Sequence, residues 1–341
     1  MLLPPGTILH KDLNTSFTNF EELLLNLKEN RFSGYLHLNF WGYEGILVLD
    51  NGKIIQGSSV EERSLQLGEQ GIQKILQKAR EKDGTIDVHQ LSNEVAIGLA
   101  AVLGANLFFE EKNVIGGRLP GIFAEMEEAG FTGYLDIEFS NKRGTATVYL
   151  LDGVTVEAVI MSNTGKLVSG EIVYAKIIEI SEMITSSVKI YRSNRIENVQ
   201  EDQLFIFPHS SSPRLLFWNK VIELLRHEFA RVAKKIDFDS LFQISKAEVG
   251  HHFPCFDAID VGFVLDKQEG LRIRKIIPVK DFEEGLKQCF SLMLEKVSPR
   301  KRKKMNQEWI ATQLKKFVQD TQEKLPEPEQ VIAKIFQGVS S

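Results

Sequence analysis

Hydrophobic and polar residues follow the same order twice within the first two hundred positions. Each copy begins with an amphipathic helix, in which apolar residues recur every three or four positions. Alternating runs then predict antiparallel strands joined by tight turns, and a second helix and a last strand complete the unit. The predicted module is a small antiparallel sheet covered by helices. Its strands are expected at 35–40, 45–49, 53–56 and 85–89 in the first copy, and at 147–151, 154–157 and 187–191 in the second.

The second helix of each copy has one predicted apolar face. In the first copy this face contains Leu67, Ile72, Ile75, Leu76 and Ala79. In the second copy the helical spacing selects Ile172, Ala175, Ile178 and Met183.

A short signature aligns the two copies. Phe32-Ser33-Gly34-Tyr35-Leu36 matches Phe131-Thr132-Gly133-Tyr134-Leu135 at an offset of 99, and the offset rises to 102 only through loops. A duplication followed by drift produces this pattern. Gly34 and Gly133 are expected where the backbone turns or approaches a helix closely. The residues interpreted as structural are Phe32, Gly34, Tyr35, Gly52, Phe131, Gly133, Tyr134 and Gly153.

The signature also carries a family resemblance. A helix, then Phe-[Ser/Thr]-Gly-Tyr-Leu, then an apolar hairpin ending in Asp-Asn-Gly-Lys-Ile-Ile-Gln-Gly, resembles the PATAN-type module of bacterial signalling proteins. The resemblance covers 17–92 and 116–194. It implies a protein-interaction adaptor in a bacterial signalling or motility-type system, with a small GTPase or a receiver protein as partner. The chain departs from that setting because it has no receiver-like acidic cluster with an accompanying lysine.

The remaining sequence predicts a different domain. Residues 198–214 are polar and rich in turn formers, which is typical of a linker. Beyond them, helical spacing and a strand pair at 258–265 and 271–277 predict a helix-rich α+β domain. The expected domains are 1–112 and 113–197 for the two repeat modules, 198–214 for the linker and 215–341 for the C-terminal domain. The fold class is α+β, with two tandem small antiparallel-sheet-plus-helix modules followed by this domain.

Composition narrows the class of protein. With 43% hydrophobic and 26% charged residues, the chain of 341 residues is typical of soluble globular proteins. The apolar stretch 95–109 is too short to span a bilayer and predicts a buried helix instead. The N-terminus lacks the basic and apolar segments of a secretory signal. Cys255 and Cys289 are the only cysteines, which excludes a disulfide framework and favours a reducing compartment. We therefore expect a cytoplasmic protein.

Candidate chemistry is sparse. Asn163-Thr164-Gly165-Lys166-Leu167 lacks the residues of a phosphate loop, and no cofactor is predicted. The segment from His251 to Asp257 holds the densest set of metal-ligand types, but adjacent His side chains in an extended chain point apart. We interpret this segment as an apolar turn with Phe253 and Phe256 inward, and Cys255 as lacking a partner that would activate it. A ligand site, metal site or active site near His251–Asp260, or between the repeats, is the alternative.

A basic cluster stands out after residue 298. It comprises Arg300, Lys301, Arg302, Lys303 and Lys304, and it could contact nucleic acid, an acidic partner or an anionic membrane surface. A solvated loop is the commoner explanation of such a run. The net charge of −5 argues against a protein that coats nucleic acid, and no aromatic residues are interleaved with the cluster.

These patterns favour a non-catalytic regulatory or scaffold protein that acts through protein contacts. The repeated positions are core and turn residues, and no polar cluster is duplicated. Accordingly, no catalytic residue and no metal ligand is predicted. Homo-oligomerisation is left open.

Overall fold

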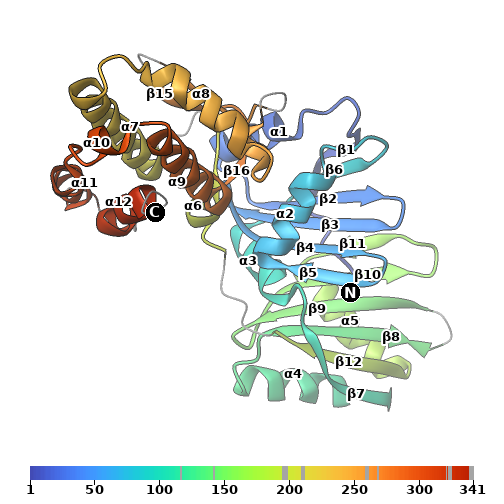
Figure 1. The fold of residues 1–341 in the computed structure, drawn as a ribbon. Helices are drawn as coiled ribbons and strands as arrows, with labels where there is room; N and C mark the ends of the chain where they lie inside the picture. The colour runs from blue at the N-terminus through green and yellow to red at the C-terminus, as the bar shows by residue number, and fades with distance from the viewer. Residues whose placement is uncertain are drawn as a thin grey trace. The chain divides into compact units, whose positions relative to one another are not determined.

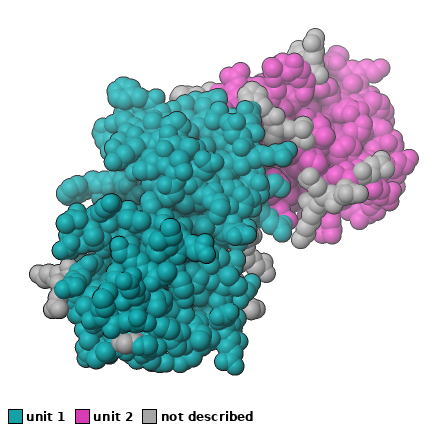
Figure 2. All heavy atoms as spheres, turned by 180° about the vertical axis from the view of Figure 1, so that it is seen from behind, with its two compact units in different colours: residues 1–201 teal, residues 202–341 magenta. Residues whose placement is uncertain are grey.

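The computed structural model describes residues 1–115, 117–140, 143–193, 199–208, 212–257, 261–266, 269–319, 321 and 325–337. The chain divides into two compact units, residues 1–201 (unit 1) and residues 202–341 (unit 2), which Figure 2 colours separately. Unit 1 contains two antiparallel sheets and unit 2 is mainly helical. The predicted α+β class is therefore confirmed. No helix of the described residues is long and apolar enough to cross a membrane.

The first sheet, in the described part of unit 1, has six strands in the spatial order β1-β6-β2-β3-β4-β5. Two helices, α1 (Phe20–Glu29) and α2 (Gly68–Lys78), belong to this module, and α2 packs on β3 and β4 (Figure 1). The strands are β1 (Thr7–Asn14), β2 (Gly34–Phe40), β3 (Tyr43–Asp50), β4 (Lys53–Glu61), β5 (Ser64–Leu67) and β6 (Thr85–Gln90).

The second sheet repeats this topology. Its described strands run β7-β12-β8-β9-β10-β11, which is the first order with six added to each number. Helices α4 (Arg118–Glu128) and α5 (Glu171–Met183) take the places of α1 and α2. The strands are β7 (Asn106–Val114), β8 (Gly133–Phe139), β9 (Gly144–Leu151), β10 (Val154–Ser162), β11 (Leu167–Ser169) and β12 (Ser186–Arg192).

The signature glycines stand where two strands come close together. A Cβ on Gly34 would lie 2.1 Å from the carbonyl oxygen of His89, and a Cβ on Gly133 would lie 2.0 Å from that of Tyr191. These oxygens belong to equivalent residues of β6 and β12. The close approach is therefore to a strand, whereas the sequence suggested a turn or a helix.

The hydroxyl residue of the signature holds the following hairpin turn. Ser33 Oγ donates to Asp50 Oδ1 at 3.0 Å and accepts from the Asn51 amide at 2.8 Å. Thr132 does the same in the second module, with Asp152 providing both the carboxylate at 3.3 Å and the amide at 2.9 Å. The shared Phe-[Ser/Thr]-Gly motif thus encodes one turn in two places.

The apolar stretch 95–109 does not form a single helix, contrary to expectation. Helix α3 (Asn93–Val102) ends before Gly104, whose φ of +77° turns the chain into β7. Because β7 pairs only with β12 among the described strands, it belongs to the second sheet. The expected module boundary at 112/113 falls inside this strand, so residues 106–112 join the second module.

The buried face of α5 also differs from the expected one. Ile172 is 85% exposed and Met183 is 68% exposed, whereas Val173 and Ile177 are buried. The helix begins directly after Gly170, whose amide is bonded to the Ala158 carbonyl oxygen. This anchor sets which side of α5 meets the sheet.

The two sheets of unit 1 share a core that contains α3. Tyr35 and Val48 come from the first sheet, Tyr149 and Val159 from the second, and Leu99 from α3. Each sheet therefore has its own helices and also takes part in the apolar centre of unit 1.

Unit 2 is built around one large apolar cluster. Phe217, Trp218, Phe242, Phe282 and Phe290 are buried in it. Its described elements, together with α6 at the unit boundary, are α6 (Glu201–Leu204), β13 (Phe205–Ile206), α7 (Pro213–Val232), α8 (Phe238–Val249), the 3-10 helix η2 (Pro254–Phe256), β14 (Phe263–Asp266), β15 (Gly270–Ile273), β16 (Ile277–Pro278), α9 (Val279–Glu295), α10 (Pro299–Arg302), α11 (Gln307–Gln319) and α12 (Pro328–Gln337).

The expected linker is partly ordered structure. Phe205 and Ile206 are buried and form β13, which pairs with β16. The Val199 amide donates to the Ile55 carbonyl oxygen at 3.0 Å, and Glu201 pairs with Lys28, so the end of unit 1 is fixed to the first module. Residues 198 and 209–211 of the expected linker lie outside the described residues.

Candidate functional site

Residues 1–6, named the strap here, contact the second sheet through their first two residues. The Leu2 amide donates to Thr147 Oγ1 at 2.9 Å, and the Tyr149 hydroxyl donates to the Leu2 carbonyl oxygen at 2.6 Å. Burial raises the pKa of Tyr149 well above its ordinary value. The phenol therefore remains a hydrogen-bond donor throughout the physiological pH range.

The strap then continues to the first sheet. The Tyr35 hydroxyl donates to the Pro4 carbonyl oxygen at 2.9 Å, and His89 Nδ1 donates to that of Pro5 at 2.8 Å. The Tyr35 and His89 rings are stacked, with centroids 4.6 Å apart. The strap is thus held by side chains of both repeats.

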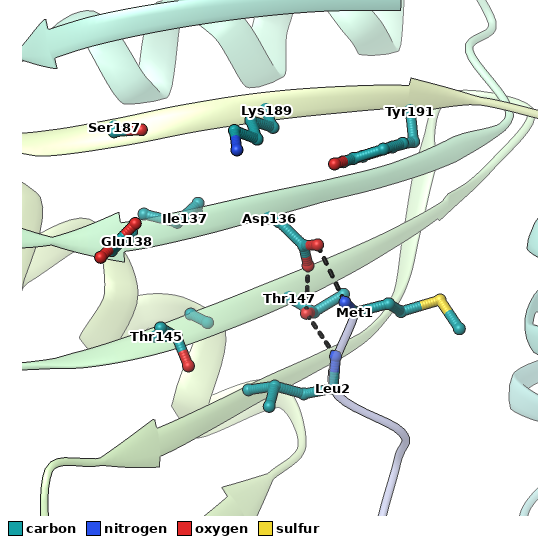
Figure 3. Close-up of a pocket in the computed structure, with 11 residues that line it drawn as sticks. Met1, Leu2, Asp136, Ile137, Glu138, Thr145, Thr147, Ser187, Lys189 and Tyr191 are labelled. Carbon is teal, nitrogen blue, oxygen red and sulfur yellow. Dashed lines mark hydrogen bonds and ion pairs between the residues drawn. The ribbon is translucent and has the colours of Figure 1, made fainter. Parts of the chain in front are cut away.

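A polar cavity of about 240 Å³ lies beside the first residues of the strap on the second sheet (Figure 3). The Met1 amino group lies 2.9 Å from Asp136 Oδ2, and Thr147 Oγ1 donates to Asp136 Oδ1 at 2.6 Å. The cavity is lined by Met1, Leu2, Asp136, Ile137, Glu138, Thr145, Ala146, Thr147, Ser187, Lys189 and Tyr191. Its charged contacts hold the strap.

The repeat does not preserve this cavity chemistry. In the first sheet the positions of Asp136 and Thr145 are occupied by His37 and Glu44, which are 2.8 Å apart. The hydrogen bond from His37 lowers the pKa of Glu44. The two modules therefore share their cores and turns, while the polar residues at these positions differ.

A second polar cavity, of about 400 Å³, lies along β4 and β5. Glu61 is its central charged group, 2.8 Å from Lys74 Nζ and 3.0 Å from Lys78 Nζ. Hydrogen bonds from these lysines lower the pKa of Glu61. The carboxylate is thus already matched by two cations of α2.

The segment proposed as an alternative ligand site lies between α8 and β14. Phe256 is fully buried and packs on Phe263, while His251 and His252 are exposed. Phe253 is partly buried against the same core. Across the described residues, no group of three or more His, Cys, Asp or Glu is arranged to hold a metal ion. Residues 258–260 of this candidate, Asp260 included, lie outside the described structure.

Burial dominates the environment of Cys255 and suppresses the reactivity of its thiol. Burial, reinforced by the charge of Asp281, raises the pKa of its thiol to about 12. Burial also lowers the pKa of Lys246, whose Nζ donates to the Phe263 carbonyl oxygen at 2.7 Å. A thiol needs the opposite shift to become a nucleophile at neutral pH.

The basic cluster occupies α10 and the turn after it, next to the end of α7. Arg231 connects α7 to this turn. Its Nη2 donates to the Lys304 carbonyl oxygen at 2.5 Å and pairs with Glu228 at 2.6 Å. Glu228 also accepts from the Asn306 amide at 2.8 Å. The turn that carries the cluster is therefore fixed to α7.

The fold adds residues to the cluster that the linear sequence did not suggest. Lys234 and Lys235 are exposed three and four positions after Arg231, at the same end of α7. The rings of His227 and Trp309 lie next to this junction with centroids 5.1 Å apart. The basic surface is defined as Lys234, Lys235, Arg300, Lys301, Arg302, Lys303 and Lys304. A sequence signal existed only in the Lys234-Lys235 pair, which is 65 positions from the cluster.

An exposed apolar edge was also not predicted. On β7, Leu107, Phe108 and Phe109 are 53%, 50% and 47% exposed. The Arg192 guanidinium lies over the Phe108 ring, 3.8 Å from its centroid. We name Leu107, Phe108, Phe109 and Arg192 the aromatic edge.

Comparison with known families gives one partial match. Residues 1–100 match a family model described as "Uncharacterized protein conserved in archaea (DUF2226)". This span covers the strap, the first sheet and most of α3. Neither the curated proteins nor the solved structures yield a significant match. The resemblance to the bacterial PATAN-type module was wrong, because the matching family is an archaeal one and the quoted motif residues encode a turn and a close strand pair.

Proposed function

We propose that this chain is a non-catalytic scaffold that acts through protein contacts, and that it self-associates through the aromatic edge. The observation that carries the proposal is the run Leu107-Phe108-Phe109, three consecutive large apolar side chains that are all about half exposed. A strand normally alternates its faces, and an exposed apolar run of this length indicates a binding surface.

The geometry of β7 favours contact through side chains over the addition of a strand. Leu107 pairs with Tyr191 and Phe109 pairs with Ile190, so Phe108 is an extra residue in a bulge. Bulges at an edge disfavour continued backbone pairing with another chain. The partner therefore meets the rings and the Arg192 guanidinium.

Self-complementarity favours a second copy as the partner. The Arg192 guanidinium lies over the Phe108 ring, 3.8 Å from its centroid, so a cation and an aromatic ring are presented together. A two-fold axis beside Phe108 lets the ring of each copy contact the ring and the guanidinium of the other, so each contact forms twice. Glu110 lies opposite Lys189 in the register, on the other face of the sheet, and pairs with Lys112.

The first repeat provides an internal comparison. Ile8 and Leu9 of β1 correspond to Leu107 and Phe108 and are also exposed, but His10 replaces Phe109 and Gln90 replaces Arg192. The β1 edge thus has part of the apolar surface, but it has neither the two adjacent phenylalanine rings nor the cation.

Sedimentation velocity over a range of concentrations tests the proposal. We expect the wild type to dimerise, Phe108→Ser with Phe109→Ser to be monomeric, and the matched control Ile8→Ser with Leu9→Ser to dimerise. Arg192→Ala should weaken the dimer, whereas Glu110→Gln, on the other face of the sheet, should leave it unchanged. A wild type that stays monomeric, or equal behaviour of the two serine pairs, would overturn the proposal.

A further inference from the structure

We propose that the basic surface of unit 2 binds the phosphate backbone of single-stranded nucleic acid. This site is separate from the aromatic edge, which lies in unit 1. The net negative charge of the whole chain does not reflect the charge of unit 2. Residues 1–201 contain 18 Lys and Arg against 27 Asp and Glu, whereas residues 202–341 contain 23 against 19. The positive charge is concentrated further where the end of α7 meets α10.

The cations of this surface are available for an external anion. Among the described residues, no ion pair involves a side chain of the basic surface. Carboxylates close to this surface in the sequence have other partners. Glu228 binds Arg231 and the Asn306 amide, and Asp237 accepts hydrogen bonds from the Ser240 amide and hydroxyl. Asp239 binds Arg226 at 2.6 Å. Glu308, at the start of α11, is the acidic residue closest in sequence to the cluster.

The surface is also rigid at its centre. The Arg231 guanidinium connects α7 to the Lys304 carbonyl oxygen, and its bond to Glu228 lowers the pKa of that carboxyl group. Both groups stay charged at neutral pH. Lys234, Lys235 and the cluster are thus presented together, and a bound strand does not have to order the junction first.

The aromatic pair favours a single strand over a duplex. The His227 ring is exposed and Trp309, partly buried, lies tilted against it by 39°. Single-strand binders combine a cationic path for phosphates with aromatic rings on which bases stack. No aromatic residue is interleaved with the cluster in the sequence, and the ring pair arises because the fold places His227 of α7 against Trp309 of α11.

The surroundings argue against a membrane surface as the ligand. Stable electrostatic attachment to lipid combines cations with apolar side chains that insert between headgroups. In the described part of unit 2, the exposed large apolar residues are Leu216, near the start of α7, and Ile244, in the middle of α8. The observed combination of cations and a ring pair fits nucleic acid better.

Fluorescence anisotropy with a labelled single-stranded oligonucleotide and the matching duplex tests the proposal. We expect binding at low salt with a linear dependence of log K on log salt, and tighter binding of the single strand. Lys234→Glu with Lys235→Glu, and separately Lys303→Glu with Lys304→Glu, should each weaken binding about tenfold or more. Each variant should also reduce the salt slope by about 0.7 for every phosphate that the surface no longer neutralises. Lys280→Glu with Lys316→Glu is the control, since it makes the same charge change at exposed sites elsewhere in unit 2.

Tryptophan fluorescence tests the ring pair. In a Trp41→Phe background, the remaining tryptophans are Trp309 and the fully buried Trp218. Quenching by the single strand, with affinity reduced about fivefold or more by His227→Ala, would support stacking. No binding at low salt, or equal loss in the control, would overturn the proposal. Binding to vesicles with anionic lipid but not to either oligonucleotide would overturn it in favour of a membrane surface.

Discussion

The Tyr149 hydroxyl donates a 2.6 Å hydrogen bond to the Leu2 carbonyl oxygen and so joins residues 147 positions apart. Tyr35, in the other sheet, holds Pro4 of the same strap in the same way. The two repeats are therefore connected through a segment that belongs to neither repeated sequence.

Removing one strap hydrogen bond should loosen residues 1–5 and leave the sheets intact. Thr147→Val removes the acceptor of the Leu2 amide and the donor to Asp136, and we expect a loss of about 2 kcal/mol in unfolding free energy. Hydrogen exchange should accelerate in the strap. Thr145→Val is the control, because this side chain lines the same cavity and lies two residues away on β9. Equal exchange in both variants would contradict this assignment.

The close strand approach at Gly133 should tolerate no side chain. A Cβ there would lie 2.0 Å from the Tyr191 carbonyl oxygen, so we expect Gly133→Ala to lower the unfolding free energy by about 3 kcal/mol. Gly121→Ala should act in the opposite direction, with a gain of about 0.5–1 kcal/mol, because a Cβ on this helical glycine would meet only Arg118 Nη1, at 3.8 Å. Chemical denaturation measures both; a mild effect at Gly133 would refute the steric argument.

The thiol of Cys255 should be unreactive in the folded protein. With a pKa of about 12, only about one molecule in ten thousand carries the thiolate at pH 8, and Cys289 is buried with its pKa also raised by burial. Titration with a disulfide reagent should detect both thiols only after unfolding. An introduced cysteine at exposed Thr164 supplies the reference rate. Rapid native labelling of Cys255 would reopen the question of an activated thiol.

Acid should weaken unit 2 partly through Glu228. The bond to Arg231 lowers the pKa of Glu228 in the folded state, so its stabilising effect is present above the unfolded pKa of about 4.3 and is lost as the pH falls through the folded value. Glu228→Gln should cost about 1–2 kcal/mol at neutral pH, and the difference from wild type should shrink in acid. Glu223→Gln alters an exposed pair with Lys220, and it should change neither the unfolding free energy at neutral pH nor its dependence on pH. Parallel pH profiles for wild type and Glu228→Gln would exclude this linkage.

Local patterns in the sequence were sufficient to find both sheets. The same hairpin is marked in each module by Phe32, Gly34 and Gly52 and by their counterparts. These residues are close together in the sequence, so a short motif is enough to predict the hairpin. The first strand of each module was missed. β1 is almost entirely exposed, and β7 was merged with α3 because the apolar run continues past Gly104.

Other features required the tertiary structure. Helical spacing predicted a face of α5 that contains Ile172, whereas the structure buries Val173 and Ile177 instead. Helix α8 was not predicted. The sequence suggested Arg300–Lys304 as an interaction site, but the position of Lys234 and Lys235 beside it depends on the contact between Arg231 and Lys304.

The strap also bears on how the protein is made. Residues 1–6 leave the ribosome before Thr147 and Tyr149, which emerge only after the first sheet and α3 have been synthesised. The first module can therefore fold during translation while its leading segment still lacks half of its hydrogen-bond partners. Completion of β9 is the earliest point at which that segment can close over both sheets, so a chain arrested before residue 147 should leave it accessible to protease.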